Sequence, residues 1–223
     1  MTALDLRLSC YAITDQASAL GRSDEVVAQA LLRGGCTCLQ YRAKKVAARV
    51  QWRVASALRD LAHAAGALFI VNDRVDLALD CGADGVHLGQ DDLPVAAARS
   101  LSRRAGNPGL LVGLSTHSLS QALAAERERP DYIGCGPIYE TRTKENNVPA
   151  IGLGVLAEVL KAVSMPVVAI GGIQEGRLAE LAKVGTRHCA IVTALTSAED
   201  PAEVSLRTWS AWRRLGESVR IDA

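Results

Sequence analysis

A short apolar run occurs eight times in this chain, and this repetition restricts the possible folds. The runs span residues 9–13, 36–41, 67–71, 85–88, 110–114, 132–135, 166–170 and 188–192. Several are continuously apolar rather than alternating, which is typical of parallel strands covered on both faces. The chain is therefore predicted to form a parallel sheet that is covered by helices.

Helical patterns fill most of the segments between these runs. Ser23 is a candidate N-cap before apolar residues at helical spacing, and Pro94 stands where its missing N–H suits the first turn of a helix. Eight strand–helix units without a linker-like segment favour a (β/α)8 TIM barrel, with residues 1–223 as a single domain. The rival fold is an open doubly wound sheet. Its glycine-rich fingerprint is missing after the first run, where residues 11–15 read YAITD.

Charge and composition exclude several classes of function. The 25 Lys and Arg residues against 24 Asp and Glu leave a net charge of +1, which gives no electrostatic basis for binding nucleic acid or a membrane surface. No segment has the pattern of a signal peptide or a membrane span. Six scattered cysteines without a CxxC motif predict reduced thiols, so we expect a cytoplasmic protein. The sequence is compatible with a homo-oligomer.

Polar residues follow almost every apolar run, at the positions where the strands of a barrel would end. They occur at residues 14–15, 40–44, 72–73, 90–92, 115–117, 136–144, 171–172 and 192–193. The loops that follow the strands of a (β/α)8 barrel open onto one face, so these groups should line a common cavity. We therefore place the active site at the C-terminal ends of the strands.

Two carboxylates, Asp73 and Asp92, follow the third and fourth runs, which are adjacent strands of the predicted barrel. Hard oxygen ligands without a neighbouring Cys or His suit Mg²⁺ rather than zinc. The alternative is that each aspartate only caps the helix that follows it. Because both lie at the same rim on neighbouring strands, we favour a shared magnesium site.

Three cations are predicted at the same rim. Arg42 and Lys44 leave the second run on the same side, and Lys144 follows the sixth run. Together with a divalent metal they fit a diphosphate, whose charge a single ion cannot neutralise. Each of them taken alone would be read as a solvated surface charge.

A second anion site is predicted after the seventh and eighth runs. Gly171 and Gly172 precede a helix, and Val192 and Thr193 close the last strand. In barrels of this kind, the loops after strands 7 and 8 often bind a phosphate monoester through backbone N–H groups. The rim thus offers two phosphate sites. This predicts two small phosphorylated substrates bound at once, with residues 141–144 between them.

Seven motifs, taken in order, resemble the thiamine-phosphate synthase family. They are QYRAK (40–44), FIVND (69–73), GVHLGQDD (85–92), GLSTH (113–117), GPIYETRTK (136–144), AIGGI (169–173) and TSAEDP (196–201). The resemblance implies a (β/α)8 barrel that joins 4-amino-2-methylpyrimidin-5-ylmethyl diphosphate to 4-methyl-5-(2-phosphooxyethyl)thiazole. The products are thiamine phosphate and diphosphate, so the implied activity is that of a Mg²⁺-dependent transferase.

The resemblance also implies roles for individual residues. Substrate-binding positions are Gln40, Tyr41, Arg42, Ala43, Lys44, Asn72, Ser115, Thr141, Arg142, Thr143, Lys144, Gly172, Val192 and Thr193. The pyrimidine diphosphate is assigned to residues 40–44, Asn72, Ser115 and Lys144, and the thiazole phosphate to Thr141, Thr143, Gly172, Val192 and Thr193. Arg42, Lys44, Ser115 and Lys144 are expected to act in catalysis, and Asp73 and Asp92 to ligate Mg²⁺. Ala43 stands where the family usually has an acidic residue.

The mechanism implied by the resemblance is dissociative. Diphosphate leaves first, and the thiazole nitrogen attacks the methylene cation that remains. This nitrogen carries no proton, so no general base is required, and His87 is expected to be a hydrogen-bonded core residue. Two other functions are considered. A related thiazole tautomerase generally lacks the Asn-Asp and TxTK features, and a non-catalytic phosphate-ligand sensor would not need Asp73 together with Asp92.

Overall fold

Eight parallel strands, paired in sequence order, close into a barrel in the computed structural model, which describes residues 3–141, 143 and 148–221. The strands are β1 (Cys10–Ile13), β2 (Cys38–Tyr41), β3 (Leu68–Asn72), β4 (Gly85–Leu88), β5 (Leu111–Thr116), β6 (Tyr132–Cys135), β7 (Val167–Ile170) and β8 (His188–Ile191). Strand β1 pairs with both β2 and β8, which closes the ring. The predicted (β/α)8 barrel is confirmed.

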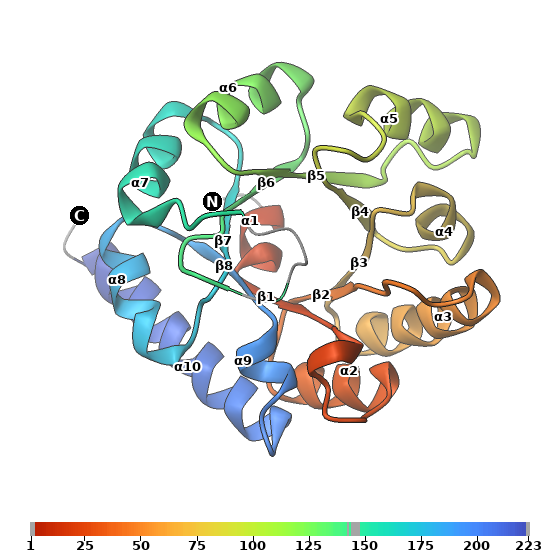
Figure 1. The fold of residues 1–223 in the computed structure, drawn as a ribbon, viewed down its shortest axis with the longest axis horizontal. Helices are drawn as coiled ribbons and strands as arrows, with labels where there is room; N and C mark the ends of the chain where they lie inside the picture. Colours follow the sequence, from red (N-terminus) through yellow and green to blue (C-terminus); the bar gives the residue numbers. More distant parts are fainter. Residues whose placement is uncertain (1–2, 142, 144–147, 222–223) are drawn as a thin grey trace.

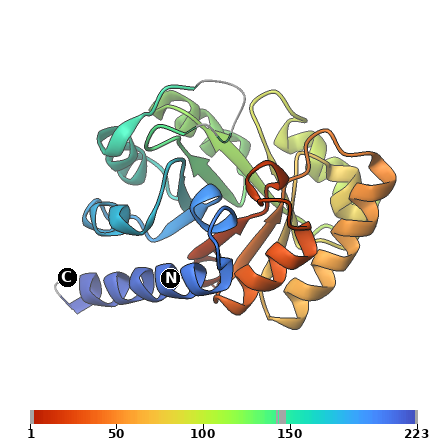
Figure 2. The same cartoon turned by 60° about the horizontal axis from the view of Figure 1, so that its bottom comes forward.

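Helices fill the connections and surround the strands (Figure 1). They are α1 (Ala3–Leu8), α2 (Asp24–Arg33), α3 (Ala48–Ala64), α4 (Val75–Asp80), α5 (Val95–Arg104), α6 (Leu119–Glu128), α7 (Gly152–Ala162), α8 (Leu178–Lys183), α9 (Thr193–Thr196) and α10 (Pro201–Ile221), with short 3-10 turns at Gln16–Ser18 and Glu175–Arg177. The Ser23 side chain accepts a hydrogen bond from the Val26 N–H at 3.4 Å, which confirms the predicted N-cap. Figure 2 shows α10 running along the outside of the molecule next to α2.

Side chains that alternate along each strand separate into two apolar layers. One layer fills the inside of the barrel and includes Tyr11, Ile70 and Tyr132. The other packs between the strands and the helices and includes Phe69 and Trp209. Because both faces of every strand are covered, neither face has to be polar, which explains the continuous apolar runs of the sequence.

Helix α1 closes the N-terminal end of the barrel. Leu8 is fully buried and Leu4 partly buried against the interior layer. The Asp5 carboxylate lies 3.4 Å from the His188 ring at the start of β8. In Figure 1, α1 lies within the ring of strands. This plug leaves the C-terminal ends of the strands as the open mouth.

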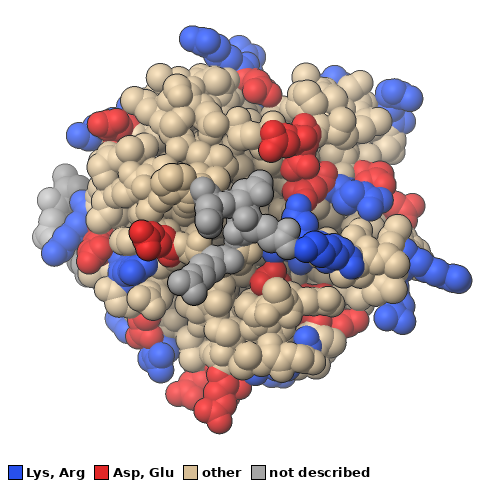
Figure 3. Space-filling model, in the orientation of Figure 1, with Lys and Arg blue, Asp and Glu red and all other residues tan. Residues whose placement is uncertain are grey.

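Acidic and basic side chains are interspersed over the face seen in Figure 3, which agrees with the small net charge. The six cysteines are buried free thiols, as predicted. Among the described residues, no helix is both long enough and apolar enough to cross a membrane.

Candidate active site

A cavity of about 510 Å³ opens at the C-terminal ends of the strands. Its lining includes the predicted site residues Gln40, Arg42, Asn72, Ser115, Thr141, Thr143, Gly172, Val192 and Thr193. Residues that the sequence assigns to two different phosphate sites therefore share one cavity. Arg142 and Lys144, which were also predicted here, lie outside the described residues.

Arg42 is held at the cavity by an ion pair. Its Nη1 lies 2.6 Å from Asp15 Oδ1, and both side chains are largely buried. The Arg42 backbone N–H also lies 3.4 Å from the Thr14 hydroxyl. Asp15 follows β1 as Asp73 follows β3, and this position at a strand end was the only sequence signal for its role. Asp15 was therefore not among the predicted site residues.

Lys44, Asp73 and Asp92 form a charged group at the rim. Lys44 Nζ lies 2.5 Å from Asp73 Oδ2, and the Lys44 side chain is half exposed. Partial desolvation, followed by the nearby Asp73 carboxylate, raises the pKa of Asp92 above its usual value, although the Gly89 N–H and Lys44 act in the opposite direction. The two aspartates thus lie close enough to interact, although neither is among the residues that line the cavity. Two carboxylates so close together favour a cation between them.

The aspartates do not cap the helices that follow them. Helix α4 has Arg74 at its N-cap and α5 has Pro94, and neither cap residue makes a side-chain hydrogen bond to the helix. Asp92 Oδ2 instead accepts a hydrogen bond from the Gly89 N–H at 2.7 Å, within the loop after β4. The capping alternative is therefore wrong, and both carboxylates are available at the mouth.

Within the QYRAK motif, Gln40 and Arg42 line the cavity, whereas Tyr41 and Ala43 do not. The Tyr41 side chain is buried in the layer between strands and helices, and Ala43 packs against the same layer. Alternation along β2 explains this placement, because Gln40 points into the barrel and its neighbour must point outwards. Any contact of Tyr41 with a substrate therefore comes from its main chain, and its binding role stays a prediction.

A chain of hydrogen bonds runs through residues that line the cavity. Gln40 Nε2 donates to the Tyr11 hydroxyl at 2.7 Å, and the Tyr11 and Tyr132 hydroxyl oxygens lie 2.9 Å apart. His87 Nδ1 lies 3.1 Å from the Tyr132 hydroxyl, and His87 Nε2 lies 2.9 Å from Ser115 Oγ. His87 is hydrogen-bonded, as the sequence predicted, but it lies at the cavity wall.

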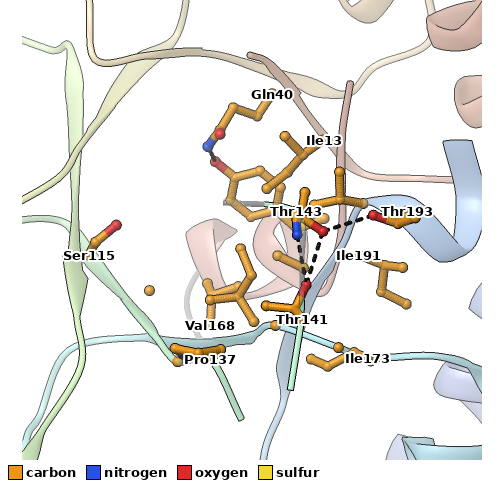
Figure 4. Close-up of a pocket in the computed structure, with 18 of the residues that line it drawn as sticks. Ile13, Gln40, Ser115, Pro137, Thr141, Thr143, Val168, Ile173, Ile191 and Thr193 are labelled. Atoms are coloured by element: carbon orange, nitrogen blue, oxygen red, sulfur yellow. Dashed lines mark hydrogen bonds between the residues drawn. The ribbon is translucent and has the colours of Figure 1, made fainter. Parts of the chain in front are cut away.

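Three threonines gather on another side of the cavity, away from Ser115 (Figure 4). The hydroxyl oxygens of Thr141 and Thr143 lie 3.0 Å apart, and those of Thr143 and Thr193 lie 2.8 Å apart. This cluster joins the loop after β6 to the first residue of α9. The sequence placed Thr193 at the end of the last strand, but β8 already ends at Ile191.

The loop after β7 passes close to the same threonines and requires glycine. Gly172 has a φ of +63°, and a Cβ atom there would lie 2.6 Å from the Glu140 carbonyl oxygen. Arg177, which sequence reasoning missed, donates from Nη1 to the Gly172 carbonyl at 2.6 Å, and its guanidinium lies 4.2 Å from the centre of the Tyr139 ring. Arg177 therefore brings a cation to this side of the cavity wall.

Comparison with known proteins shows to which family this chain belongs. A sequence model of the family described as thiamine monophosphate synthase matches residues 10–195. The chain belongs to the thiamine-phosphate synthase family. A thiamine-phosphate synthase of Chloroflexus aurantiacus is 46% identical over 88% of each chain, and one of Archaeoglobus fulgidus is 41% identical over 99% of this chain and 97% of its own. The thiamine phosphate pyrophosphorylase of Pyrococcus furiosus superposes with a TM-score of 0.87 at 34% identity, covering 95% of this chain and 98% of that one.

Membership of the thiamine-phosphate synthase family confirms the predicted enzyme class. The protein is a transferase of thiamine biosynthesis on a TIM barrel. Barrels with other activities, such as 3-hexulose-6-phosphate synthase, share only the fold, at 13% identity and a TM-score of 0.61. The site residues are therefore interpreted in terms of the synthase reaction.

Proposed function

We propose that the cavity binds the pyrimidine diphosphate and the thiazole phosphate side by side and joins them into thiamine phosphate. The pyrimidine diphosphate would lie near Gln40, Arg42, Asn72 and Ser115, with the thiazole phosphate near the threonine cluster. The observation that carries the proposal is the meeting of both groups of residues in one cavity with a charged rim. The free cysteines support a cytoplasmic location.

Asp73 and Asp92 fit a magnesium ion. The Lys44 ammonium beside Asp73 serves as a stand-in cation, and it can leave because its side chain is half exposed. Among the described residues, no group of three or more His, Cys, Asp or Glu could hold a metal, so the pair would need waters and substrate oxygens as further ligands. This is how Mg²⁺ is usually bound in phosphate-transferring sites. A bound Mg²⁺ would neutralise charge on the leaving diphosphate.

Arg42 and Lys44 would hold the diphosphate as it leaves. Arg42 is already fixed by Asp15, so little reorganisation is needed when negative charge develops on the leaving group. Lys44 would exchange its carboxylate partner for a phosphate oxygen. Lys144, outside the described residues, keeps its predicted role in binding the diphosphate. Both cations stabilise the departing charge more than the intact substrate, which is the condition for a higher rate.

The rest of the cavity would hold the reactants in line. Gln40 and Ser115 would orient the pyrimidine, while the threonine cluster and the backbone near Gly172 would anchor the thiazole phosphate. The thiazole nitrogen could then attack the methylene cation without a general base, because it carries no proton. Holding both partners in one cavity removes much of the entropic barrier to a reaction between two molecules.

Asp92→Asn tests the proposed metal site. The substitution keeps the shape and the acceptor for the Gly89 N–H but removes one negative charge. We expect kcat with saturating substrates to fall about 100-fold or more, the size of effect seen when a single group that stabilises the transition state is lost. Thiamine phosphate formation is measured across a Mg²⁺ titration, in which the variant should also need more Mg²⁺.

The matched control is Asp91→Asn, which removes the same charge from the exposed neighbouring residue. It should retain wild-type turnover and Mg²⁺ dependence. Equal losses in the two variants, or wild-type turnover in the absence of Mg²⁺, would contradict a magnesium site at Asp73 and Asp92.

A further inference from the structure

The described part of the cavity wall contains two arginines, and they differ in their partners. Arg42 forms an ion pair with Asp15 at 2.6 Å. Arg177, which is partly buried, forms no ion pair with a carboxylate in the described part of the chain. Charged side chains that are partly removed from water are usually paired. The positive charge of Arg177 is therefore available to an anion in the cavity.

Two contacts hold the guanidinium of Arg177 in place. Its Nη1 donates to the Gly172 carbonyl at 2.6 Å, and its centre lies 4.2 Å from the centre of the Tyr139 ring. The Tyr139 hydroxyl donates to Glu180 Oε2 at 3.0 Å, which holds the ring in turn. An aromatic ring attracts a cation without neutralising its charge, so Arg177 is fixed and still fully positive.

These contacts use few of the donors of Arg177. A guanidinium carries five N–H donors in one plane. The Gly172 carbonyl accepts from Nη1, and Arg177 makes no other hydrogen bond to residues 3–141, 143 and 148–221. The donors that remain form a planar fork, which matches two oxygens of a phosphate group.

Arg177 lies next to the proposed site of the thiazole phosphate. Its hydrogen bond reaches Gly172, and Gly172 lies against the residue that precedes Thr141, where a Cβ atom on Gly172 would meet a carbonyl oxygen at 2.6 Å. Thr141 continues to Thr143 and Thr193 through hydroxyl contacts of 3.0 and 2.8 Å. The guanidinium and the threonine cluster therefore belong to one side of the cavity.

The chemistry of this site leaves a place for a cation. A phosphate monoester carries a charge of about −1.5 to −2 near pH 7. The threonine hydroxyls and backbone N–H groups that would hold it are neutral donors. Hydrogen bonds between two charged partners are shorter and stronger than neutral ones. A guanidinium would therefore supply charge neutralisation that the other groups of the site lack.

We propose that Arg177 binds the thiazole phosphate directly, and that Tyr139 is the positioning residue that holds its guanidinium at the phosphate. Both roles depend on the proposed function in one respect, because the thiazole phosphate has to lie beside Gly172. They add the charge that distinguishes a phosphorylated thiazole from the same thiazole with a free hydroxyl group.

Thiamine phosphate and thiamine are suitable probes, because they differ only in this phosphate. Each fills both halves of the proposed site, and neither can react when diphosphate is absent. Their dissociation constants are measured by calorimetry in a buffer without phosphate or diphosphate. The wild type should bind thiamine phosphate about 100-fold or more tightly than thiamine, as expected for a phosphate held by a charged partner.

Arg177→Gln is the decisive variant. Its amide can still donate to the Gly172 carbonyl, but the positive charge is lost. The preference for thiamine phosphate should fall about tenfold or more, while the affinity for thiamine changes by less than about threefold. A role in the fold alone would weaken both probes equally. Arg177→Lys keeps the charge and should retain more of the preference than Arg177→Gln.

Tyr139 provides a second test that leaves Arg177 in the chain. Tyr139→Leu removes the ring beside the guanidinium and should lower the preference about threefold or more. Tyr139→Phe keeps the ring and should retain more of the preference than Tyr139→Leu. Equal preferences in the wild type and folded Tyr139→Leu would overturn the positioning role.

Arg207→Gln is the matched control. Arg207 pairs with Glu175, which belongs to the same 3-10 turn as Arg177, but Arg207 is exposed and does not line the cavity. This variant should keep the wild-type preference. An equal loss in Arg207→Gln, an unchanged preference in folded Arg177→Gln, or equal binding of both probes by the wild type would overturn the role of Arg177. If the wild type bound neither probe, the proposed function would be wrong, and the role of Arg177 with it.

Discussion

At the scale of single residues, the geometry of Arg42 comes from a distant partner. Ala43, between Arg42 and Lys44, carries no charge that could pair with either cation. Asp15, in the loop after the neighbouring strand β1, pairs with Arg42 at 2.6 Å. The position of Arg42 therefore depends on a residue far away in the sequence.

Asp15→Asn should weaken binding of the pyrimidine diphosphate. A charged hydrogen bond of this kind contributes about 2 kcal/mol, and without it Arg42 is free to adopt other rotamers. We expect KM for the pyrimidine diphosphate to rise about tenfold, with a smaller change for the thiazole phosphate. Steady-state kinetics with each substrate varied in turn provide the measurement.

Asp60→Asn is the comparison, because it breaks an exposed ion pair with Arg59 on the outer surface. It should leave both KM values unchanged. Equal effects on both substrates in Asp15→Asn would show that Asp15 stabilises the fold in general rather than Arg42.

At the scale of elements, α1 acts as the plug of the barrel. A short helix of six residues has little stability of its own, so its position must come from packing. Leu8 is buried in the interior layer, whereas Leu6 is 55% exposed. A substitution at Leu8 can therefore test the packing of α1, and the same substitution at Leu6 is its control.

Leu8→Ala should destabilise the protein by about 3 kcal/mol, as expected for truncation of a fully buried leucine. Leu6→Ala should change the free energy of unfolding by less than about 0.5 kcal/mol. Urea denaturation of both variants gives the two values. The folded Leu8→Ala enzyme should keep its kcat, because α1 lies at the end of the barrel opposite the cavity. A similar loss of stability in both variants would show that α1 does not pack as described.

At the scale of the whole molecule, stability should depend on pH through His188. Burial lowers the pKa of His188 below 6.5, although the Val167 carbonyl and Asp5 act in the opposite direction. The folded state therefore prefers the neutral ring. The resulting stability is complete above about pH 6.5 and is lost as the pH falls towards the lower folded pKa.

His188→Asn should reduce this dependence. For the wild type, the free energy of unfolding should decrease between pH 6.5 and 5 with a contribution from His188 of at most about 1.4 kcal/mol per pH unit. In the variant this contribution is absent. Urea denaturation at several pH values measures both slopes, and equal slopes would show that His188 is not responsible.

Much of the molecule could be read from local patterns. The eight apolar runs predicted the strands because burial on both faces demands continuous apolar sequence. The residues at strand ends predicted the rim, since all such loops meet on one face of a barrel. The proximity of Asp73 and Asp92 follows from the same rule, because the two residues lie in the loops after neighbouring strands; their role as metal ligands stays a prediction.

Local sequence patterns were therefore sufficient to predict the barrel, its open end and the charges around its mouth. Tertiary structure alone decided that Asp15 holds Arg42, that Tyr41 faces outwards, and that Tyr11, Tyr132 and His87 link Gln40 to Ser115. The physical reason is the range of the interactions. Periodicity and strand ends are properties of neighbouring residues, whereas a hydrogen bond between Tyr11 and Tyr132 joins positions 121 residues apart, which only closure of the barrel brings into contact.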